Sequence, residues 1–195
     1  MATLIADMTM SLDGFIAFKN DDVGPLFDWY QVGPVETASA SEEWSYRTDE
    51  KSAEALREFT SEIGALICGR RLFDLTQGWG GKHPVGCPVV VVSHSVPEGW
   101  PRQGVPFHFA ASVEEGVALA KEIAGDRIVA VATPSMTQQC LNLGLLDVLR
   151  VNLAPVLMGD GIPWFANLAK APVMLEDPEV QEGQRVTHLT YKVRR

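Results

Sequence analysis

The apolar residues of this chain fall into short continuous runs that alternate with amphipathic segments. The runs at residues 65–68, 88–93 and 128–132 are rich in Val, Ile and Ala, which is typical of strands covered on both faces. Apolar side chains recur with a helical period in residues 50–63 and 135–143. Strands that alternate with helices predict an α/β fold with a mainly parallel sheet and helices on both of its faces.

Local signals mark the ends of some helices. Residues 112–115, Ser-Val-Glu-Glu, form a capping box that opens a helix reaching residue 124. The start of the helix at 135–143 has two alternatives. Either Thr133 is the N-cap with Pro134 at the first helical position, or Ser135 is the N-cap with Gln138 completing a capping box. The other expected elements are a helix at 71–76 and strands at 3–9, 15–18, 105–110 and 147–153.

Two segments depart from the alternating pattern. Residues 184–193 alternate between apolar and polar positions, and we expect them to pair with residues 173–180 as an antiparallel sheet edge. Residues 19–48 show no clear period, so we expect a long functional loop. This segment contains four large aromatic side chains in addition to Tyr30, and we expect them to pack over the domain. Without an internal repeat or a linker, the chain of 195 residues is predicted to be one domain, 1–195.

Charge and composition exclude several classes of function. The net charge is −9, and acidic residues concentrate in the first third of the chain, so a nucleic-acid partner is not expected. No apolar run reaches the ~20 residues of a membrane span, and residues 1–7 do not resemble a signal peptide. We therefore expect no membrane partner. Three isolated cysteines favour a reducing, cytoplasmic compartment. The histidines and cysteines lack metal-ligand spacing, so no metal is expected.

Three candidate ligand sites follow predicted strands. Ligands of open α/β sheets bind beyond the carboxyl ends of the strands. Residues 68–71, Cys-Gly-Arg-Arg, place two guanidinium groups at a helix start, which suits a phosphate, although a solvated helix start is the alternative. Residues 93–95, Ser-His-Ser, suit a phosphate or a purine, or form an ordinary loop. Residues 131–138 form a strand-to-helix crossing, and the N-terminus of this helix points out of the same edge of the sheet.

Three motifs in order carry a resemblance to a known family. They are Ser11–Ala17 (SLDGFIA), Leu66–Phe73 (LICGRRLF) and the segment from Gln138 to Gly161, which contains GLLD and PVLMGDG. Over nearly its whole length the chain resembles the dihydrofolate-reductase-like family, which includes the C-terminal reductase domain of bifunctional riboflavin-biosynthesis enzymes. The resemblance implies a three-layer fold, a homodimer, NADPH as the cofactor, and hydride transfer to a pterin-like or ribosylaminopyrimidine-like substrate. We expect the C-terminal strands and the largely apolar segment 148–158 to offer the dimer surface.

The resemblance also implies roles for single residues. The cofactor-binding positions are Ala6, Ile16 and Ala17 beside the nicotinamide, Gly69, Arg70 and Arg71 at the phosphates, Ser93, His94 and Ser95 at the adenosine, and Thr133, Ser135, Met136 and Thr137 at the pyrophosphate. Asp13 matches an aspartate that riboflavin-type members keep near the substrate, and an Asx-turn before Gly14 is its alternative role.

Two departures from the family pattern refine this prediction. Family members carry glycines where this chain has Ala132, Thr133 and Pro134, which indicates weaker cofactor binding than in relatives with those glycines. Dihydrofolate reductases bind the pterin through an acidic residue. In the corresponding segment of this chain the acids are Glu42, Glu43, Asp49 and Glu50, and none of them is a clear match, so folate reduction is not expected.

The sequence therefore predicts an NADPH-dependent reductase of a small heteroaromatic or carbonyl substrate. The paired arginines favour NADPH over NADH because only NADPH carries the additional phosphate. The enzyme would supply binding and orientation, while the cofactor supplies the hydride. The alternative is a non-catalytic nucleotide-binding protein with a reductase fold, which the missing glycines favour.

Overall fold

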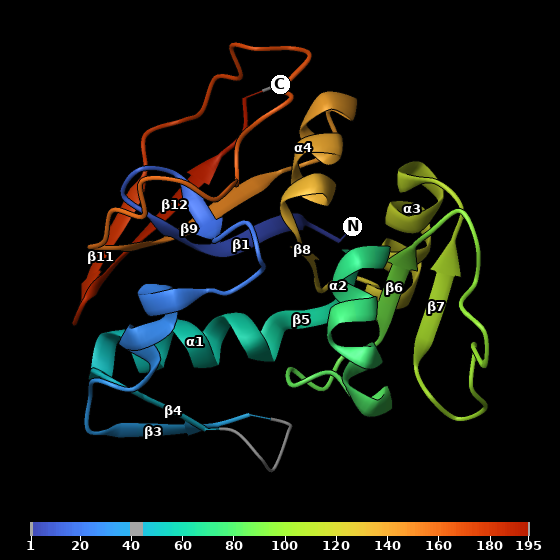
Figure 1. The fold of residues 1–195 in the computed structure, drawn as a ribbon, viewed down its shortest axis with the longest axis horizontal. Coiled ribbons are helices and arrows are strands. Elements are labelled where there is room, and N and C mark those ends of the chain that lie inside the picture. Colours follow the sequence, from blue (N-terminus) through green and yellow to red (C-terminus); the bar gives the residue numbers. More distant parts are fainter. Residues whose placement is uncertain (1, 40–44, 195) are drawn as a thin grey trace.

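The structure, a computed structural model, describes residues 2–39 and 45–194. Its middle layer is an eight-stranded sheet within these ranges, formed by β1 (Leu4–Ser11), β5 (Ile63–Gly69), β6 (Val89–Val92), β7 (Phe107–Ala110), β8 (Ile128–Ala132), β9 (Val148–Ala154), β11 (Glu179–Gly183) and β12 (Val186–Lys192). The strand order is β11-β12-β9-β1-β8-β5-β6-β7 (Figure 1). Neighbours from β9 to β7 run parallel, whereas β12 and β11 form an antiparallel edge, as predicted.

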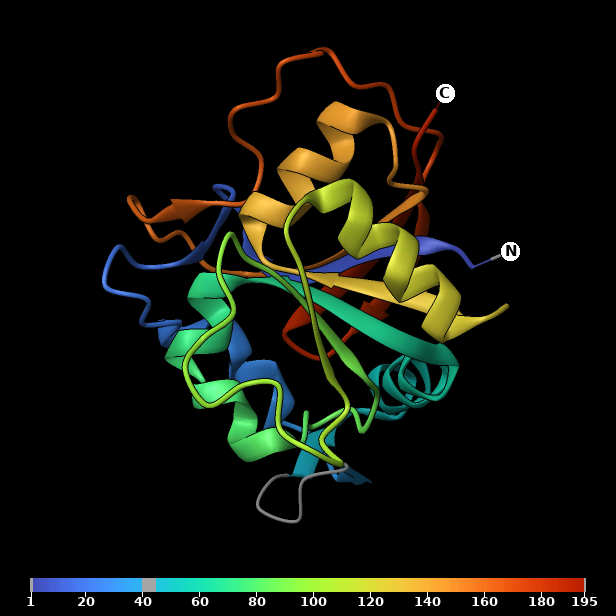
Figure 2. The same ribbon diagram turned by 90° about the vertical axis from the view of Figure 1, so that its right-hand side faces the viewer.

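Helices cover both faces of this sheet, which confirms the predicted three layers. The helices α3 (Val113–Ala124) and α4 (Pro134–Leu143) lie on one face, and α1 (Glu50–Glu62), α2 (Arg70–Leu75) and the 3₁₀-helix η1 (Gly24–Tyr30) lie on the other (Figure 2). A second short 3₁₀ segment, η2 (Gln77–Gly81), follows α2.

The strands in the middle of the sheet are apolar on both faces because each face is covered by helices. In β5, Ile67 packs in the core cluster beneath α3 and α4, whereas Leu66 and Cys68 pack in the cluster beneath α1 and α2. In β6, Val90 faces the first cluster, and its two neighbours face the second. The continuous Val run in the sequence is therefore a fully buried strand.

The prediction of one long irregular loop at residues 19–48 is wrong for the described part of this segment. It contains η1 and a hairpin of β3 (Val35–Ala38) and β4 (Ser45–Thr48), and Leu26 and Trp29 of η1 are buried. Four-residue strands and a 3₁₀-helix are too short to show a period of 2.0 or 3.6. Glu42, Glu43 and Trp44 lie outside the described residues.

Other boundaries differ from the prediction in instructive ways. Only the end of the segment 173–180 joins the sheet, because β11 begins at Glu179 and pairs with β12 from there. The short strand β2 (Phe15–Ala17) does not join the main sheet and pairs with β10 (Ile162–Pro163), which the sequence did not predict. Strand β9 lies between β1 and β12, so most of the apolar segment 148–158, expected as a dimer surface, is internal. The homodimer itself stays a prediction.

The helix starts follow the predicted signals with one exception. Thr133 is the N-cap of α4 with Pro134 at its first position, so the alternative with Ser135 as the cap is wrong. Ser112 caps α3 and accepts a hydrogen bond from the Glu115 amide, as expected. The Glu115 carboxylate, however, accepts a hydrogen bond from the amide of Ala111, the residue before the N-cap, whereas in the usual capping box it accepts from the N-cap amide. Within the described ranges no helix has the length and apolar character required to cross a membrane.

Candidate functional site

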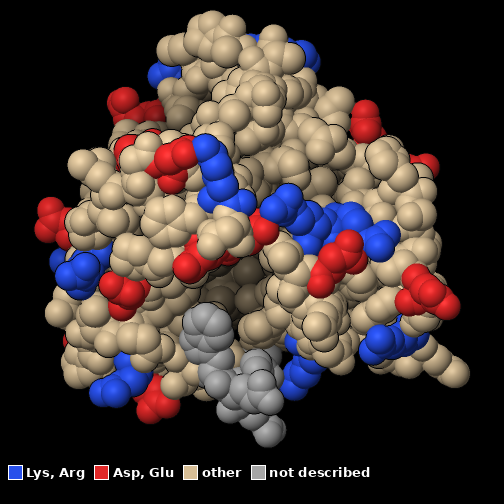
Figure 3. Space-filling model, viewed as in Figure 1, with Lys and Arg blue, Asp and Glu red and all other residues tan. Residues whose placement is uncertain are grey.

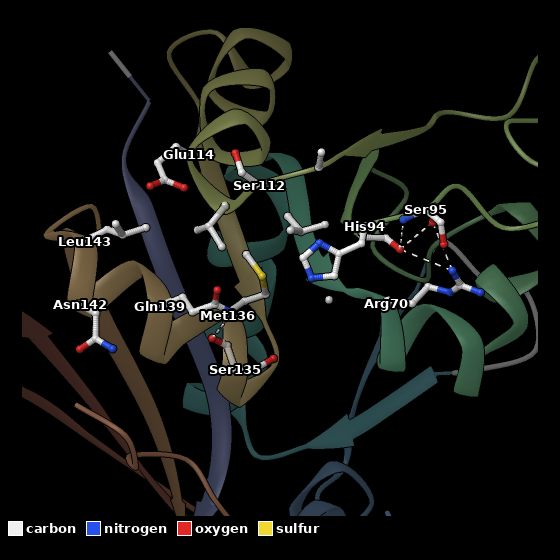
Figure 4. A pocket seen from close by; sticks show the side chains of 15 residues that line it. Arg70, His94, Ser95, Ser112, Glu114, Ser135, Met136, Gln139, Asn142 and Leu143 are labelled. Carbon is white, nitrogen blue, oxygen red and sulfur yellow. Dashed lines mark hydrogen bonds between the residues drawn. The ribbon is translucent and has the colours of Figure 1, made fainter. Parts of the chain in front are cut away.

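A cavity of about 770 Å³ lies at the carboxyl ends of β5, β6 and β7, where α3 and α4 begin (Figure 4). It brings together seven of the residues predicted from the sequence: Gly69, Arg70, Ser93, His94, Ser95, Ser135 and Met136. These residues come from three segments that are far apart in the chain. The size is within the range of small-molecule and cofactor pockets, about 300–1,000 Å³.

Arg70 is held at one end of the cavity by contacts along its guanidinium group. Its Nε donates to both carboxylate oxygens of Asp74, at 2.7 and 2.8 Å. Its Nη1 donates to the Ser95 carbonyl oxygen at 3.2 Å and to the Ser93 hydroxyl at 3.4 Å (Figure 4). Within the described part of the chain these contacts use Nε and Nη1, so the two N–H groups of Nη2 remain to bind a ligand.

Arg71 lies outside this cavity, although the sequence paired it with Arg70. Its side chain forms an exposed ion pair with Asp21, in which Nη2 and Oδ2 are 2.7 Å apart. This contact raises the pKa of the guanidinium, chiefly through the hydrogen bond to Asp21. Neighbouring residues of a helix project about 100° apart, so two consecutive arginines at a helix start do not share one site.

The loop after β6 contributes small polar groups and a ring. The Ser93 hydroxyl donates to the Ser95 carbonyl oxygen at 2.7 Å, which closes the loop on itself. The ring of His94 points into the cavity (Figure 4). The loop thus presents a flat side chain beside the Arg70 guanidinium, an arrangement suited to a purine with a nearby phosphate.

The start of α4 offers backbone donors and one unsatisfied hydroxyl. The first intrahelical bond joins the Thr137 amide to the Thr133 carbonyl, so the Ser135 and Met136 amides precede the helix ladder. The Thr133 side chain does not cap the helix, and its buried Oγ1 lacks a hydrogen-bond partner among the described residues. Thr133 has φ +121° and ψ 144°, a conformation that favours glycine. The backbone therefore keeps the shape of a glycine-containing turn although the residue is threonine.

Gly69 leaves open space in front of this helix start. A Cβ atom on Gly69 would lie 3.6 Å from Ser135 Oγ and 3.7 Å from Thr133 Oγ1. The glycine backbone of β5 therefore faces both hydroxyls across a gap that a side chain would fill. Thr137, in contrast, is buried, and its hydroxyl donates to the Thr133 carbonyl at 3.0 Å, so it holds the turn together and does not line the cavity.

Several lining residues were not singled out from the sequence. Ser112 and Glu114 enter from the start of α3, and Gln139, Asn142 and Leu143 enter from α4 (Figure 4). The capping box at 112–115 was a usable signal for the first pair, because it follows the carboxyl end of a parallel strand, as the other candidate sites do. Residues on the inner side of a helix carry no such local signal.

The residues expected at the nicotinamide lie apart from this cavity. Ala6 and Ile16 both pack in the core cluster beneath α3 and α4, and Ala17 is buried in β2. The register of the sheet places Ala6 beside Val131, two residues before Thr133. The expected nicotinamide wall is therefore close in the sheet to the α4 start, on the side away from Arg70.

Asp13 makes contacts that fasten the turn after β1. Its Oδ1 accepts from the Ser11 hydroxyl at 2.6 Å and from the Met158 amide at 3.1 Å, and its Oδ2 accepts from the Gly159 amide at 2.7 Å. The Ser11 hydrogen bond, followed by that from Gly159, lowers the pKa of the carboxyl. The carboxylate joins two loops that are 145 residues apart, and its lowered pKa does not suit a proton donor.

No family model matches the chain. The uncharacterized protein YyaP of Bacillus subtilis (strain 168) is 25% identical over 179 residues, which cover 85% of this chain and 81% of YyaP. A Shewanella sp. PV-4 protein, provisionally assigned to riboflavin biosynthesis, has a crystal structure that covers 100% of both chains with a TM-score of 0.71 and 20% identity.

Two further solved structures are enzymes. Dihydrofolate reductase from Enterococcus faecalis, complexed with NADP(H) and RAB-propyl, has a TM-score of 0.59 and 13% identity over 99% of this chain and 97% of that chain. A Thermotoga maritima diaminohydroxyphosphoribosylaminopyrimidine deaminase/5-amino-6-(5-phosphoribosylamino)uracil reductase has a TM-score of 0.63 and 12% identity, covering 98% of this chain and 56% of that chain. The chain has the dihydrofolate-reductase-like fold that its sequence motifs predicted.

Proposed function

We propose that this protein binds NADPH in the cavity and reduces a small heteroaromatic or carbonyl substrate. The observation that carries the proposal is the convergence of Arg70 with the unused amides at the start of α4, on either side of Gly69. Backbone N–H groups at a helix N-terminus and a guanidinium group are two independent ways to bind phosphate oxygens.

The described residues fit the phosphates of a dinucleotide. Arg70, together with the loop from Ser93 to Ser95, would hold the adenosine 2′-phosphate through Nη2. The amides of Ser135 and Met136 would hold the pyrophosphate in the space that Gly69 leaves open. The buried Thr133 hydroxyl has no partner in the described chain, and a phosphate oxygen at the helix start would supply one.

The bound cofactor would supply a hydride, and the protein would supply orientation. The ends of β5 and β6 would fix the adenosine half of the ligand because Arg70 joins the segments that follow these two strands. The position of Ala6 next to the α4 start would then direct the other half of the ligand toward β1. The reductases among the structural neighbours, one of them complexed with NADP(H), support this assignment.

Glu114 is the feature of the cavity that opposes a highly charged ligand. Its carboxylate lies in the same cavity as Arg70, at the start of α3 (Figure 4). A carboxylate there would accept hydrogen bonds from ribose hydroxyls and repel a phosphate. We infer that NADPH is preferred over NADH only if Arg70 attracts the additional phosphate more strongly than Glu114 repels it.

Titration calorimetry with NADPH and with NADH tests this proposal. We expect NADPH to bind with micromolar affinity and NADH more weakly, because only NADPH reaches Arg70 with a dianionic phosphate. Absence of NADPH binding at millimolar concentration would remove the reductase function. Binding without oxidation of NADPH by any pterin, aminopyrimidine or carbonyl compound would favour the non-catalytic nucleotide-binding protein instead.

A further inference from the structure

Strands β1 and β8 separate in the middle of the sheet, and the residue at this fork is Asp7. The two strands pair from Leu4 and Val129 to Ala6 and Val131, whereas β1 continues to pair with β9 as far as Ser11. Beyond Ala6, β1 therefore has an edge that β8 does not cover, facing the point where the chain turns into α4. Backbone groups at such a fork are available to a ligand.

The side chain of Asp7 projects to the face of the sheet that carries α1 and η1. Its neighbours Ala6 and Met8 pack on the other face, beneath α3 and α4, and alternate residues of a strand point to opposite sides. The face that carries α1, α2 and η1 is hollowed near its middle (Figure 3). About a fifth of the Asp7 side chain, 21%, is exposed, so this side chain is partly buried in the middle of the sheet.

Two residues of β9 hold this carboxyl in place. Asn152 Nδ2 donates to Oδ1 at 3.1 Å. Arg150 Nε lies 3.4 Å from Oδ2, which is longer than a normal hydrogen bond, and the guanidinium stacks on Phe59 of α1 at 4.1 Å. A carboxyl group offers about four acceptor positions, so these two contacts leave hydrogen-bonding positions of Asp7 unused.

The other titratable groups around Asp7 come from each element packed against it. They are Tyr30 of η1, Tyr46 of β4, and His188 of β12, which reaches Asp7 through Asn152. Burial is the main cause of the raised pKa of both tyrosines, followed by Tyr46 and then Asp7 for Tyr30, and by Asp7 for Tyr46. Burial raises the pKa of Asp7 itself, and Arg150 and Asn152 offset part of this effect. Burial lowers the pKa of His188 to about 4.

We propose that Asp7 is the catalytic acid of this protein, placed between the nicotinamide ring and the substrate. This inference rests on the proposed NADPH-dependent reduction and adds a role for one residue of β1. The ring end of the cofactor would lie at the fork after Ala6, so the adjacent Asp7 carboxyl would contact the ring on one side and the substrate on the other.

The reaction balances with this assignment. Bound NADPH would supply a hydride, the hydrogen of its C4–H bond together with the bonding electron pair, to the electrophilic carbon of a C=N or C=O group. The Asp7 carboxyl gives its proton to the nitrogen or oxygen of that group and becomes a carboxylate. Water returns the proton after the product leaves. The ionised Asp7 would then attract the positively charged ring of the oxidised cofactor.

Asn152 and His188 act as positioning residues in this arrangement. Asn152 donates to Asp7 through Nδ2, so its Oδ1 is an acceptor for the His188 Nδ1 at 2.7 Å. The Nε2 of His188 is 3.0 Å from the buried Ser52 hydroxyl. These contacts fix which end of the Asn152 amide faces Asp7. Ser52 is fully buried, so the pair of Ser52 and His188 does not form an accessible nucleophilic site.

The charge on the oxidised ring gives a test that needs no substrate. NADP⁺ and NADPH share the same phosphates, so the ratio of their dissociation constants reports only on the nicotinamide end. An ionised Asp7 attracts the NADP⁺ ring, and we expect Asp7→Asn to weaken NADP⁺ about tenfold while NADPH changes less than twofold. The pKa of Asp7 is raised by burial, so in the unaltered protein the preference for NADP⁺ should increase as the pH rises above the ordinary range of a carboxyl group and Asp7 ionises. This increase should be absent in Asp7→Asn.

Asp177→Asn is the matched control, because it removes one exposed carboxylate in the loop before β11 and should leave the ratio unchanged. The pH series on the unaltered protein keeps the test valid even if Asp7→Asn fails to fold. A ratio that is independent of pH, or equal weakening of both dinucleotides in the variant, would overturn the role of Asp7 and leave the reductase function standing. If the unaltered protein binds neither dinucleotide, the reductase function fails and the role of Asp7 fails with it.

Discussion

Arg70 and Ser95 are joined by a hydrogen bond from Nη1 to the carbonyl oxygen, 3.2 Å long, between the start of α2 and the loop after β6. The bond spans 25 residues of sequence and two neighbouring parallel strands. It fixes the guanidinium before any ligand arrives, and the Asp74 carboxylate fixes it from the other side. A prearranged guanidinium loses little side-chain entropy when it binds phosphate.

The first prediction compares Arg70→Ala with Arg71→Ala. Charge-assisted hydrogen bonds to phosphate contribute about 1.5–3 kcal/mol, so Arg70→Ala should weaken NADPH at least tenfold and NADH much less. Arg71 is paired with Asp21 outside the cavity, so Arg71→Ala should change either affinity less than twofold. Calorimetric titration of both variants with both cofactors gives the comparison. Equal losses of NADPH and NADH in Arg70→Ala would remove the 2′-phosphate role.

The second prediction concerns the acidic wall of the cavity. Glu114→Gln keeps the size and the hydrogen-bonding capacity of the side chain but removes its charge at the start of α3. NADPH should bind about threefold more tightly because one like charge is removed, and NADH should gain less. The exposed Glu122→Gln, near the other end of α3, is the control for a change in net charge. Tighter binding in both variants would show that only the overall charge matters.

Much of the architecture followed from local patterns in the sequence. The Val run of β6 and the apolar β8 are buried on both faces, so their composition alone identifies parallel strands. The cavity was located because each candidate motif followed the carboxyl end of a predicted strand. These features depend on neighbouring residues, and the sequence contains that information directly.

The parts that were missed depend on contacts between distant segments. The direction of Arg71 depends on Asp21, 50 residues earlier, and two adjacent arginines look alike in sequence. Asp7 stands in an apolar strand, and its partner Asn152 is 145 residues away. The strain at Thr133 is equally invisible, because a threonine before Pro134 is expected to be extended with negative φ. Such properties arise only when the chain is folded.

The third prediction is a pH dependence of stability that arises from buried histidines. Burial lowers the pKa values of His83 and His188 to about 4. Below the unfolded pKa of about 6.5 the unfolded chain binds protons that the folded chain does not, so stability should fall as the pH decreases from 6.5 to 4. Each histidine should contribute up to about 3 kcal/mol to this loss.

Urea unfolding at pH 7 and pH 5 measures this effect. His188→Gln can keep hydrogen bonds to Asn152 and Ser52 but cannot be protonated, so its loss of stability between the two pH values should be smaller than that of the unaltered protein. His83→Gln should give a similar, independent reduction. Asp7, whose pKa is raised, acts in the opposite direction, and it is present in all three proteins. An unchanged pH dependence in both variants would contradict the buried, neutral state of these rings.

The last prediction concerns Thr133, where folding and binding make opposite demands. Its φ of +121° costs about 1–3 kcal/mol for a residue other than glycine, and its buried hydroxyl has no partner in the described chain. Thr133→Gly removes both costs, although the unfolded chain gains entropy worth about 0.4–1 kcal/mol. The free energy of unfolding should therefore rise by about 1 kcal/mol. The missing glycine predicted weaker cofactor binding from the sequence alone, whereas the buried, unpaired hydroxyl favours a contact to a phosphate oxygen. Thr133→Gly should therefore bind NADPH several-fold more weakly, because the hydroxyl at the α4 start is lost. Thr133→Ser keeps the hydroxyl and the strain, so it should bind NADPH as tightly as the unaltered protein without the gain in stability. Urea unfolding and calorimetry on the two variants separate the effects, and tighter NADPH binding by Thr133→Gly would show that the side chain obstructs the cofactor instead of binding it.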